Sequence, residues 1–204
     1  MLVKKNTLCY NLICENMFFG GTVMIFLFLA DGFEETEALV TLDLMRRAQI
    51  DVKTVGKPQV RGAHNITVAS DIDISQAAKF KCDGVVLPGG MPGTNNLYAD
   101  EFVRATVRSC ASSGKMVAAI CAAPLILGRM GILENKKAVC FPGFESELHG
   151  AVLCNSPAQT DGNIITAKGA GAVFDFAHAV ISFLKDKSLA DKILDDIQFP
   201  GKVG

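Results

Sequence analysis

The sequence predicts a doubly wound α/β sandwich, and three observations support that fold class. From Val23 onward, apolar runs of strand length alternate with segments of helical periodicity. The apolar runs are continuous rather than alternating with polar residues, which is typical of a parallel sheet covered on both faces. The chain has 204 residues, of which 50% are hydrophobic and 20% charged, as in an ordinary globular domain. The strand–helix order then favours a sheet with helices on both sides.

The first half of this pattern contains two strands, one helix and an irregular segment. We expect strands at Val23–Ala30 and Asp51–Val55, a helix at Glu35–Ala48, and a hairpin or edge excursion at Pro58–Asp73. The helix would bury a stripe formed by Leu39, Leu42 and Met45.

The second half repeats the alternation. We expect strands at Asp83–Leu87, Lys115–Ile120, Ala138–Phe141, Ala151–Asn155 and Ile164–Ala167, and helices at Glu101–Ser112, Pro124–Met130 and Ala172–Lys185. The last helix is strongly one-sided, and its apolar face consists of Val173, Phe176, Ala177, Val180, Ile181 and Leu184.

Residues 1–22 do not continue the pattern. They carry two early lysines, but polar residues such as Asn11 and Glu15 interrupt any secretory apolar core. The first strong apolar run, Val23–Ala30, is too short to cross a bilayer. We interpret residues 1–22 as an N-terminal extension or an upstream start ahead of Met24, and residues 23–204 as a single domain.

The net charge and the cysteine pattern argue against several classes of protein. A formal net charge of −1 gives no basic patch for nucleic acid or for an anionic membrane. The seven cysteines form no CxxC pair and have no histidine at ligand spacing, which argues against a disulfide framework and against a metal site. These features predict a cytoplasmic protein without a metal or cofactor.

Cys121 is the strongest candidate for chemistry. An apolar run ends at this residue, and Pro124 then opens a helix, where its missing N–H needs no partner. A cysteine at such a turn lies beside the positive end of the helix dipole, which favours the thiolate. The arrangement is that of a nucleophile elbow with cysteine in place of serine. The competing interpretation is a small buried apolar residue.

Other chemical groups follow neighbouring strands at the same predicted sheet edge. An acidic loop at 31–35 follows the first strand, Gly89 and Gly90 follow the strand that ends at Leu87, and residues 168–171 follow the strand at Ile164–Ala167. Exposed glycine N–H groups beside a nucleophile would form an oxyanion hole, although two glycines also suit a plain tight turn. Glu34 and Glu37 are assigned as first-turn acids that complement the helix dipole.

Five motifs of the chain resemble the DJ-1/ThiJ/PfpI superfamily, in its DJ-1 and bacterial ThiJ-like branch. They are residues 32–37 (GFEETE), 44–48 (LMRRA), 86–90 (VLPGG), 118–124 (AAICAAP) and 168–171 (KGAG), in that order. The resemblance implies a flavodoxin-like sandwich and a homodimer. It also implies that Cys121 is the reactive cysteine, that Glu35 hydrogen-bonds its sulfur, and that Gly89, Gly90 and Ala122 supply backbone donors.

The chain also departs from the family pattern. Ala122 stands where PfpI-type peptidases carry histidine, which argues against peptidase activity. Phe141 stands where some members place a histidine near the cysteine. Accessory candidates are His64, His149 and Lys168, whereas His178 in the last helix is assigned a structural role.

The resemblance implies a cysteine-dependent glyoxalase or deglycase that acts on α-oxoaldehydes or on their adducts and protects against oxidative stress. Its substrate would be a small carbonyl compound or a glycated adduct. The alternative is a non-enzymatic redox sensor or redox-regulated chaperone that works through oxidation of Cys121. A thiamine-related enzyme is implied only by the ThiJ name, and no motif of the sequence indicates a thiazole site.

Overall fold

The computed structural model describes residues 23–201, so the predicted extension at 1–22 lies outside the described residues. The strands are β1 (Met24–Phe28), β2 (Asp51–Gly56), β3 (Gln59–Arg61), β4 (Thr67–Ala69), β5 (Ile72–Asp73), β6 (Gly84–Leu87), β7 (Met116–Ile120), β8 (Lys137–Ala138), β9 (Val152–Leu153), β10 (Ala158–Asp161) and β11 (Ile164–Ala167). The helices are α1 (Glu35–Arg47), α2 (Gly93–Ala99), α3 (Glu101–Ser112), α4 (Pro124–Arg129), α5 (Val173–Leu184) and α6 (Lys187–Asp196). Short 3₁₀ helices occur at η1 (Ile74–Lys79), η2 (Glu145–Glu147) and η3 (Ala170–Ala172).

A seven-stranded sheet in the order β10-β11-β7-β6-β1-β2-β5 forms the centre of the molecule. All its neighbouring pairs are parallel except β10 and β11. The strand order reverses beside β1, so the carboxyl ends of β1, β6 and β7 surround the switch point at which open α/β sheets bind ligands. The predicted doubly wound α/β sandwich is confirmed.

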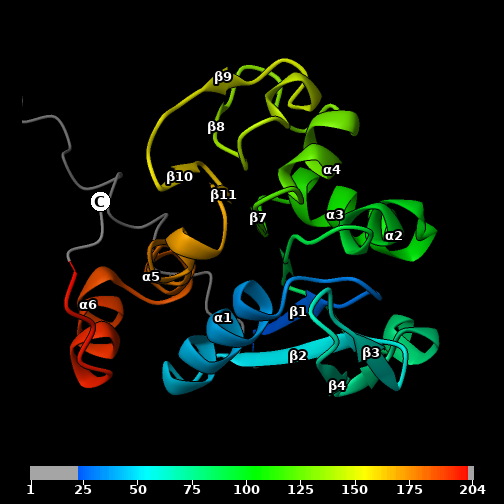
Figure 1. Cartoon of the computed structure of the whole chain (residues 1–204), viewed down its shortest axis with the longest axis horizontal. Coiled ribbons are helices and arrows are strands. Elements are labelled where there is room, and N and C mark those ends of the chain that lie inside the picture. Colours follow the sequence, from blue (N-terminus) through cyan, green and yellow to red (C-terminus); the bar gives the residue numbers. More distant parts are fainter. Residues whose placement is uncertain (1–22, 202–204) are drawn as a thin grey trace, which may run out of the picture.

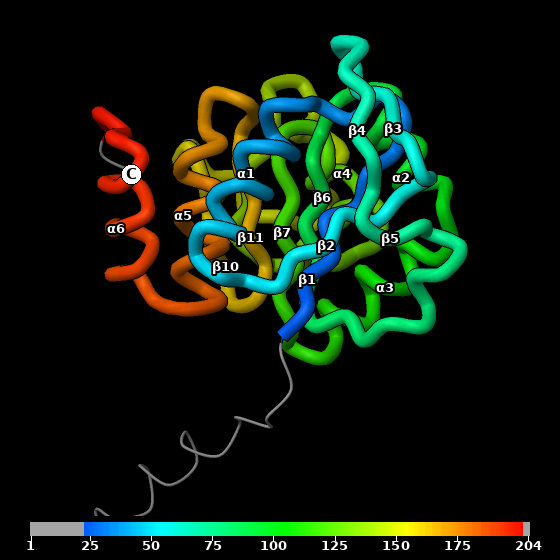
Figure 2. Tube along the Cα trace, turned by 90° about the horizontal axis from the view of Figure 1, so that it is seen from below, coloured from blue at the N-terminus to red at the C-terminus, as the bar shows by residue number. Residues whose placement is uncertain are grey.

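Helices cover both faces of this sheet (Figure 1). One buried cluster joins α1, α5 and α6 to one face, and a second joins α3 and α4 to the other. Helix α6 lies outside α5 at the edge of the molecule (Figure 2). Alternate residues of β1 pack into the two clusters. Ile25 and Leu27 belong to the first cluster, and Phe26 and Phe28 belong to the second.

The buried face of α1 differs from the predicted stripe. Met45 is fully buried, but Leu39 and Leu42 are only half-buried. The side chains that α1 buries are Glu35, Glu37, Ala38, Thr41, Leu44 and Met45. Except for Glu35, these residues follow helical spacing, so the face that packs against the sheet begins with a carboxyl group.

The predicted edge excursion and two of the predicted helices are present in the structure. The edge excursion contains the antiparallel hairpin β3–β4 and then β5, which adds to the sheet edge. Helices α3 and α5 lie where periodicity placed them, within one residue at each end. Helices α2 and α6 and strand β10 were not predicted. None of the helices within residues 23–201 is long and apolar enough to cross a membrane.

Candidate active site

Cys121 forms the predicted nucleophile elbow. Its backbone has a φ of +64°, a left-handed conformation that a non-glycine residue rarely adopts. The turn is fixed on both sides, because the Cys121 N–H donates to the Ala167 carbonyl at 2.9 Å and the Cys121 carbonyl accepts from the Phe141 N–H at 2.8 Å. Pro124 begins α4 three residues later, as predicted. The strained turn holds the half-buried thiol at the carboxyl end of β7.

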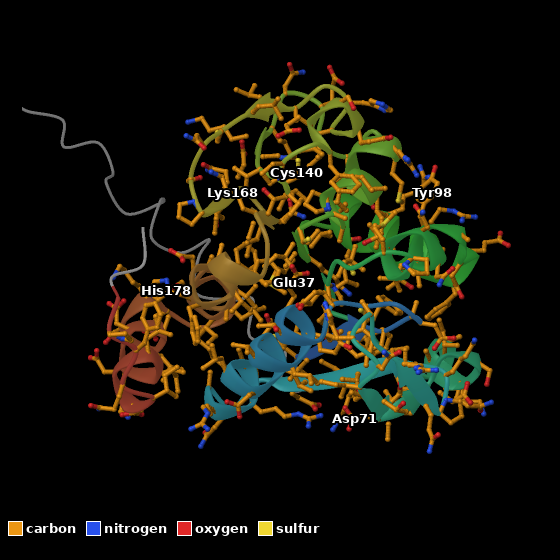
Figure 3. All side chains as sticks on the ribbon, viewed as in Figure 1. Glu37, Asp71, Tyr98, Cys140, Lys168 and His178 are labelled. Carbon is orange, nitrogen blue, oxygen red and sulfur yellow. The ribbon has the colours of Figure 1, made fainter. Side chains whose placement is uncertain are left out.

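The carboxyl group that faces this thiol belongs to Glu37. Its side chain is 1% exposed and lies near the middle of the molecule (Figure 3). The Glu37 Oε2 atom accepts the Gly89 N–H at 2.8 Å. Burial raises the pKa of Glu37 to about 7, although hydrogen bonds from Cys121 and Gly89 lower it. A carboxyl group with that pKa can change its protonation state near neutral pH.

Cys121 is not the acid-shifted thiolate that its position beside α4 suggested. Burial and the neighbouring Glu37 carboxylate raise the pKa of the Cys121 thiol to about 12. The N–H groups of Ala122 and Gly90 lower it, but these contributions are smaller. Over the pH range between the two values, the thiol and carboxyl group therefore hold one proton between them, and it rests on sulfur.

Gly89 lies between the two reactive groups. A Cβ atom at this position would lie 2.5 Å from the Cys121 Cβ and 2.8 Å from the Glu37 Oε2. No side chain fits there without separating the thiol from the carboxyl group. The glycine is therefore required by the close approach of Cys121 and Glu37.

The three predicted backbone donors have different partners. The N–H groups of Gly90 and Ala122 hydrogen-bond the Cys121 sulfur, as a donor pair at a nucleophile should. The prediction for Gly89 is wrong, since its N–H is used by the Glu37 carboxylate. Gly90 has a φ of +89°, a conformation that a glycine adopts without strain.

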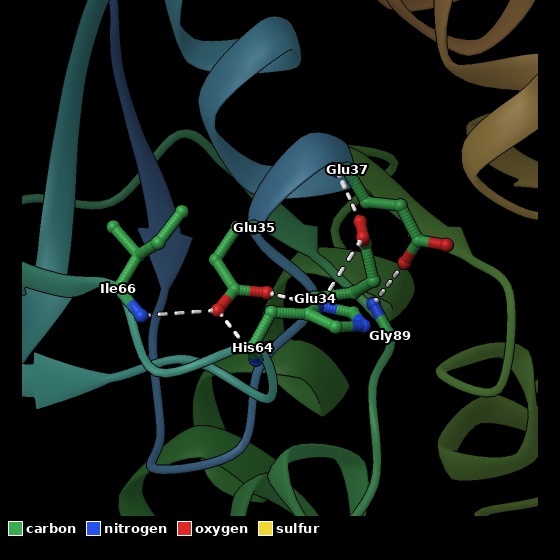
Figure 4. Close-up of polar contacts among 6 residues, drawn as sticks. All are labelled: Glu34, Glu35, Glu37, His64, Ile66 and Gly89. Carbon is green, nitrogen blue, oxygen red and sulfur yellow. Dashed lines mark hydrogen bonds and ion pairs between the residues drawn. The ribbon is translucent and has the colours of Figure 1, made fainter.

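The prediction that Glu35 is the acid partner of Cys121 is also wrong. The Glu35 carboxylate accepts the backbone N–H of His64 at 2.7 Å and contacts the His64 ring Nδ1 at 2.7 Å (Figure 4). It also accepts the Ile66 N–H at 3.4 Å. Desolvation would raise the pKa of Glu35, but these hydrogen bonds outweigh it and lower the pKa. Glu35 therefore holds the β3–β4 loop against the first turn of α1.

Glu34 and Glu37 were assigned the same helix-capping role, and only Glu34 has it. The Glu34 side chain caps α1 by accepting the Glu37 N–H at 2.7 Å. Figure 4 shows that Glu37 extends away from this cap toward Gly89, whereas Glu35 extends toward His64 and Ile66. The capping interpretation is therefore confirmed for Glu34 and wrong for Glu37.

The accessory candidates have other partners. His64 is exposed, and its hydrogen bond with Glu35 raises its pKa. The Lys168 Nζ donates to the Asn155 side chain at 2.5 Å, which fixes a loop rather than the elbow. His149 is exposed and lies near Glu147, which is paired with Arg129. His178 was not an accessory candidate. Its Nε2 atom lies 2.7 Å from the Asp191 carboxylate, between α5 and α6, which is consistent with the assigned structural role.

Phe141 lies beside the site. The residue is 47% exposed, and a Cβ atom on Gly169 would lie 3.0 Å from the Phe141 Cδ2 and 3.8 Å from the Glu37 Oε1. The aromatic edge and the Glu37 carboxyl group therefore lie close to the same glycine. An apolar surface beside the reactive pair suits a small organic substrate.

One cluster within residues 23–201 has metal-ligand spacing. The ligand atoms of Glu34, Glu35 and His64 lie within 4.8 Å of one another. Both oxygens of Glu35 already accept hydrogen bonds from the β3–β4 loop. The cluster is therefore explained by loop anchoring, and its donor set does not require an ion.

A pattern in the sequence could have identified Glu37. It lies one residue before Ala38, four before Thr41 and eight before Met45, all on the buried face of α1. A glutamate at the start of such a face must be neutral or paired when buried. The predicted stripe placed Leu39 and Leu42 on that face, which shifted it away from Glu37.

Comparisons with known proteins agree with this fold. A model described as the DJ-1/PfpI family matches residues 23–183. Protein dj-1beta of Drosophila melanogaster is 32% identical over 170 residues, which cover 81% of this chain and 91% of that protein. A protein of Pyrococcus abyssi named deglycase is 24% identical over 160 residues, which cover 76% of this chain and 96% of that protein.

The fold also matches solved structures of this kind. The crystal structure of a mutant DJ-1 superfamily protein from Salmonella typhimurium is 35% identical, with a TM-score of 0.82, and the match covers 88% of this chain and all of that one. It confirms the flavodoxin-like arrangement that the motifs implied. The chain belongs to the DJ-1/PfpI family.

Proposed function

We propose that the protein is a cysteine-dependent glyoxalase or deglycase that acts on α-oxoaldehydes or their adducts. The observation that carries this proposal is the pair formed by the half-buried Cys121 thiol and the buried Glu37 carboxyl group. Between pH values of about 7 and about 12 the pair holds one proton, so Glu37 is a general base for the Cys121 thiol at physiological pH.

The reaction begins when Glu37 takes the thiol proton and the Cys121 sulfur adds to the aldehyde carbon. The aldehyde oxygen becomes an alkoxide, which the N–H groups of Gly90 and Ala122 can stabilise beside the sulfur. Transfer of the proton from Glu37 to that oxygen gives a hemithioacetal.

A proton transfer between the two carbon atoms follows. Glu37 removes the proton from the former aldehyde carbon and delivers it to the neighbouring carbonyl carbon, while the hydroxyl proton of the hemithioacetal passes to the oxygen of that neighbouring carbon. The products of this step are a hydroxyl group and a thioester to Cys121. Water then hydrolyses the thioester to a 2-hydroxy acid and the free thiol. The aldehyde carbon is oxidised as its neighbour is reduced, so no external oxidant or reductant is consumed.

Deglycation would use the same steps. In an α-oxoaldehyde adduct of an amine or thiol, the Cys121 sulfur bonds to the former aldehyde carbon and the bond from that carbon to the amine nitrogen or thiol sulfur breaks. The proton that Glu37 took from the Cys121 thiol goes to the departing amine or thiol, and the same hemithioacetal remains on Cys121. The name deglycase of the Pyrococcus abyssi relative supports this extension of the proposal.

The redox-sensor alternative depends on different chemistry. Direct oxidation by peroxide requires a thiolate, and the raised pKa of Cys121 keeps its proton on sulfur in the resting protein. Proton transfer to Glu37 during a reaction does not require a standing thiolate. The pair therefore supports catalysis over sensing.

We also propose a homodimer in the cytoplasm. The family resemblance motivates the dimer. The seven cysteines of the sequence, an odd number without a CxxC pair, support a reducing compartment. Light scattering at micromolar concentration tests the dimer, and a monomer would contradict it.

Product formation tests the proposed activity. Purified protein should convert methylglyoxal to lactate and glyoxal to glycolate, and Cys121→Ser should abolish both. The protein should also release the free amine from a methylglyoxal adduct if it is a deglycase. Intact protein that forms no hydroxy acid, while Cys121 is readily oxidised by peroxide, would favour the sensor instead.

A further inference from the structure

A second pair of cysteines lies away from the Cys121 site. The sulfurs of Cys82 and Cys110 are 4.0 Å apart, although 28 positions separate them in the sequence. Cys82 lies in the turn that leads into β6, and Cys110 lies in the last turn of α3. Both are free thiols in this structure. Each sulfur would need to move only about 1 Å to reach the S–S bond length of a disulfide.

The two thiols differ in solvent exposure. Cys110 is 2% exposed, whereas Cys82 is half-buried. Both border a cavity of about 330 Å³ whose other lining residues are mostly apolar, among them Phe26, Phe80 and Phe102. A small oxidant in this cavity would reach Cys82, and the buried Cys110 would be its neighbour.

The polar surroundings also distinguish the two sulfurs. The Cys82 thiol lies 3.2 Å from the Gly84 carbonyl, and the Lys115 Nζ donates to the Cys82 carbonyl at 2.7 Å. The hydrogen bond from Cys110 lowers the pKa of Cys82, with Lys115 contributing, whereas the same contact raises the pKa of Cys110. Cys82 is therefore the thiol that ionises first.

We propose that Cys82 and Cys110 form a reversible disulfide site that peroxides oxidise. The inference does not depend on the proposed glyoxalase or deglycase activity. The arrangement matches the general requirement for a redox-active pair, an accessible thiol beside a resolving thiol.

The oxidation proceeds in two balanced steps. The Cys82 thiolate attacks one oxygen of hydrogen peroxide and the O–O bond breaks, so that Cys82 becomes a sulfenic acid and the departing hydroxide takes up the proton that the Cys82 thiol had released, which gives one water. The Cys110 sulfur then attacks the Cys82 sulfur, the S–O bond breaks, and the departing hydroxide takes up the Cys110 thiol proton, which gives a second water. Two thiols and one peroxide thus give one disulfide and two waters, and a dithiol reductant reverses the change.

The pair is placed apart from the active site by the sheet itself. Cys82 and Lys115 lie at the amino ends of β6 and β7, whereas Cys121 lies at the carboxyl end of β7. A disulfide between Cys82 and Cys110 would join the start of β6 to α3. It would leave the turn that holds Cys121 and Glu37 unchanged.

Peptide mapping of the full chain tests the proposal. Wild-type protein and a Cys121→Ser variant are treated with increasing hydrogen peroxide, blocked with N-ethylmaleimide, digested without reductant and analysed by mass spectrometry. We expect a linked peptide containing Cys82 and Cys110, two hydrogens lighter than the sum of its parts and separated by dithiothreitol. Cys140 and Cys154 should remain alkylated at the same peroxide concentration.

A Cys110→Ser variant provides the matched control. It should yield no linked peptide, and Cys82 should instead be trapped as a sulfenic acid by dimedone. The wild-type map requires no substitution, so a variant that fails to fold does not remove the test. Full alkylation of Cys82 and Cys110 at peroxide concentrations that already oxidise Cys140 or Cys154 would overturn the proposal. Linkage of either cysteine mainly to a third one would also overturn it.

Discussion

Glu35 and Glu37 leave the first turn of α1 in different directions and serve different purposes. The Glu35 carboxylate is held 2.7 Å from the Nδ1 atom of His64, in a loop of the β3–β4 hairpin. The Glu37 carboxylate is held 2.8 Å from the Gly89 N–H and faces Cys121. One acid therefore fixes a loop and the other is available for proton transfer.

Glu37→Gln should stabilise the protein above neutral pH. The raised pKa means that Glu37 favours folding while protonated and loses that contribution as pH rises from its ordinary value of 4.5 through about 7. Glutamine stays neutral and keeps an oxygen for the Gly89 N–H. At pH 8 we expect a higher melting temperature, equivalent to up to about 3 kcal/mol. The gain should disappear at about pH 4, and thermal melts that show destabilisation at pH 8 would contradict the assignment.

The pH dependence of turnover should follow the same group. With Glu37 as general base, kcat/KM for methylglyoxal should rise to a plateau with an apparent pKa of about 7. The upper end of the active pH range is set by loss of the Cys121 proton near a pKa of about 12, so kcat/KM should not fall within the ordinary assay range. Activity that already declines at about pH 8 would contradict this protonation scheme.

Gly89→Ala should abolish turnover even if the protein folds. The added methyl group would lie 2.5 Å from the Cys121 Cβ and would push the thiol and carboxyl group apart. Overpacking of this kind costs about 1–3 kcal/mol of stability. Gly171→Ala is the matched control, because a Cβ there meets open space and its φ is not in the left-handed range. Activity and melting temperature should change little in the control, and equal losses in the two variants would argue against a specific role of Gly89.

His64→Ala should lower stability over a limited pH window. The Glu35 contact raises the pKa of His64, so its contribution is complete below the unfolded value of 6.5 and is lost as pH rises through the folded value. As pH falls through the lowered pKa of Glu35, this carboxylate becomes protonated and the stabilisation from the His64–Glu35 contact is lost again. The difference in melting temperature between wild type and variant should therefore be largest at about pH 5–6. A difference that is constant from acid to alkaline pH would point to packing instead.

The sequence predicted the elements that depend on long, regular patterns. Continuous apolar runs identified β1, β6 and β7, and the one-sided apolar stripe identified α5 within one residue at each end. The elbow at Cys121 was also predictable, because the end of an apolar run and Pro124 define it locally. Short elements such as α2 carry too few residues to show a period.

The sequence indicates only weakly which glutamate is the partner of Cys121. Glu34, Glu35 and Glu37 lie within four positions, and each is compatible with the first turn of a helix. Which one reaches Cys121 depends on how α1 rotates about its axis when it packs on the sheet. That rotation is set by the burial of Ala38, Thr41 and Met45 rather than by local sequence. The use of the Gly89 N–H by a carboxylate likewise depends on contacts between residues 52 positions apart.

The most direct test of this account compares Glu37→Gln with Glu35→Gln in the same methylglyoxal assay. The two substitutions are chemically identical, and they lie two residues apart on one helix. If Glu37 transfers the protons, Glu37→Gln should lower kcat by about 10²–10⁴-fold, whereas Glu35→Gln should retain kcat within a few-fold. A steep loss in Glu35→Gln, with Glu37→Gln folded and fully active, would contradict the assignment of Glu37 as the partner of Cys121.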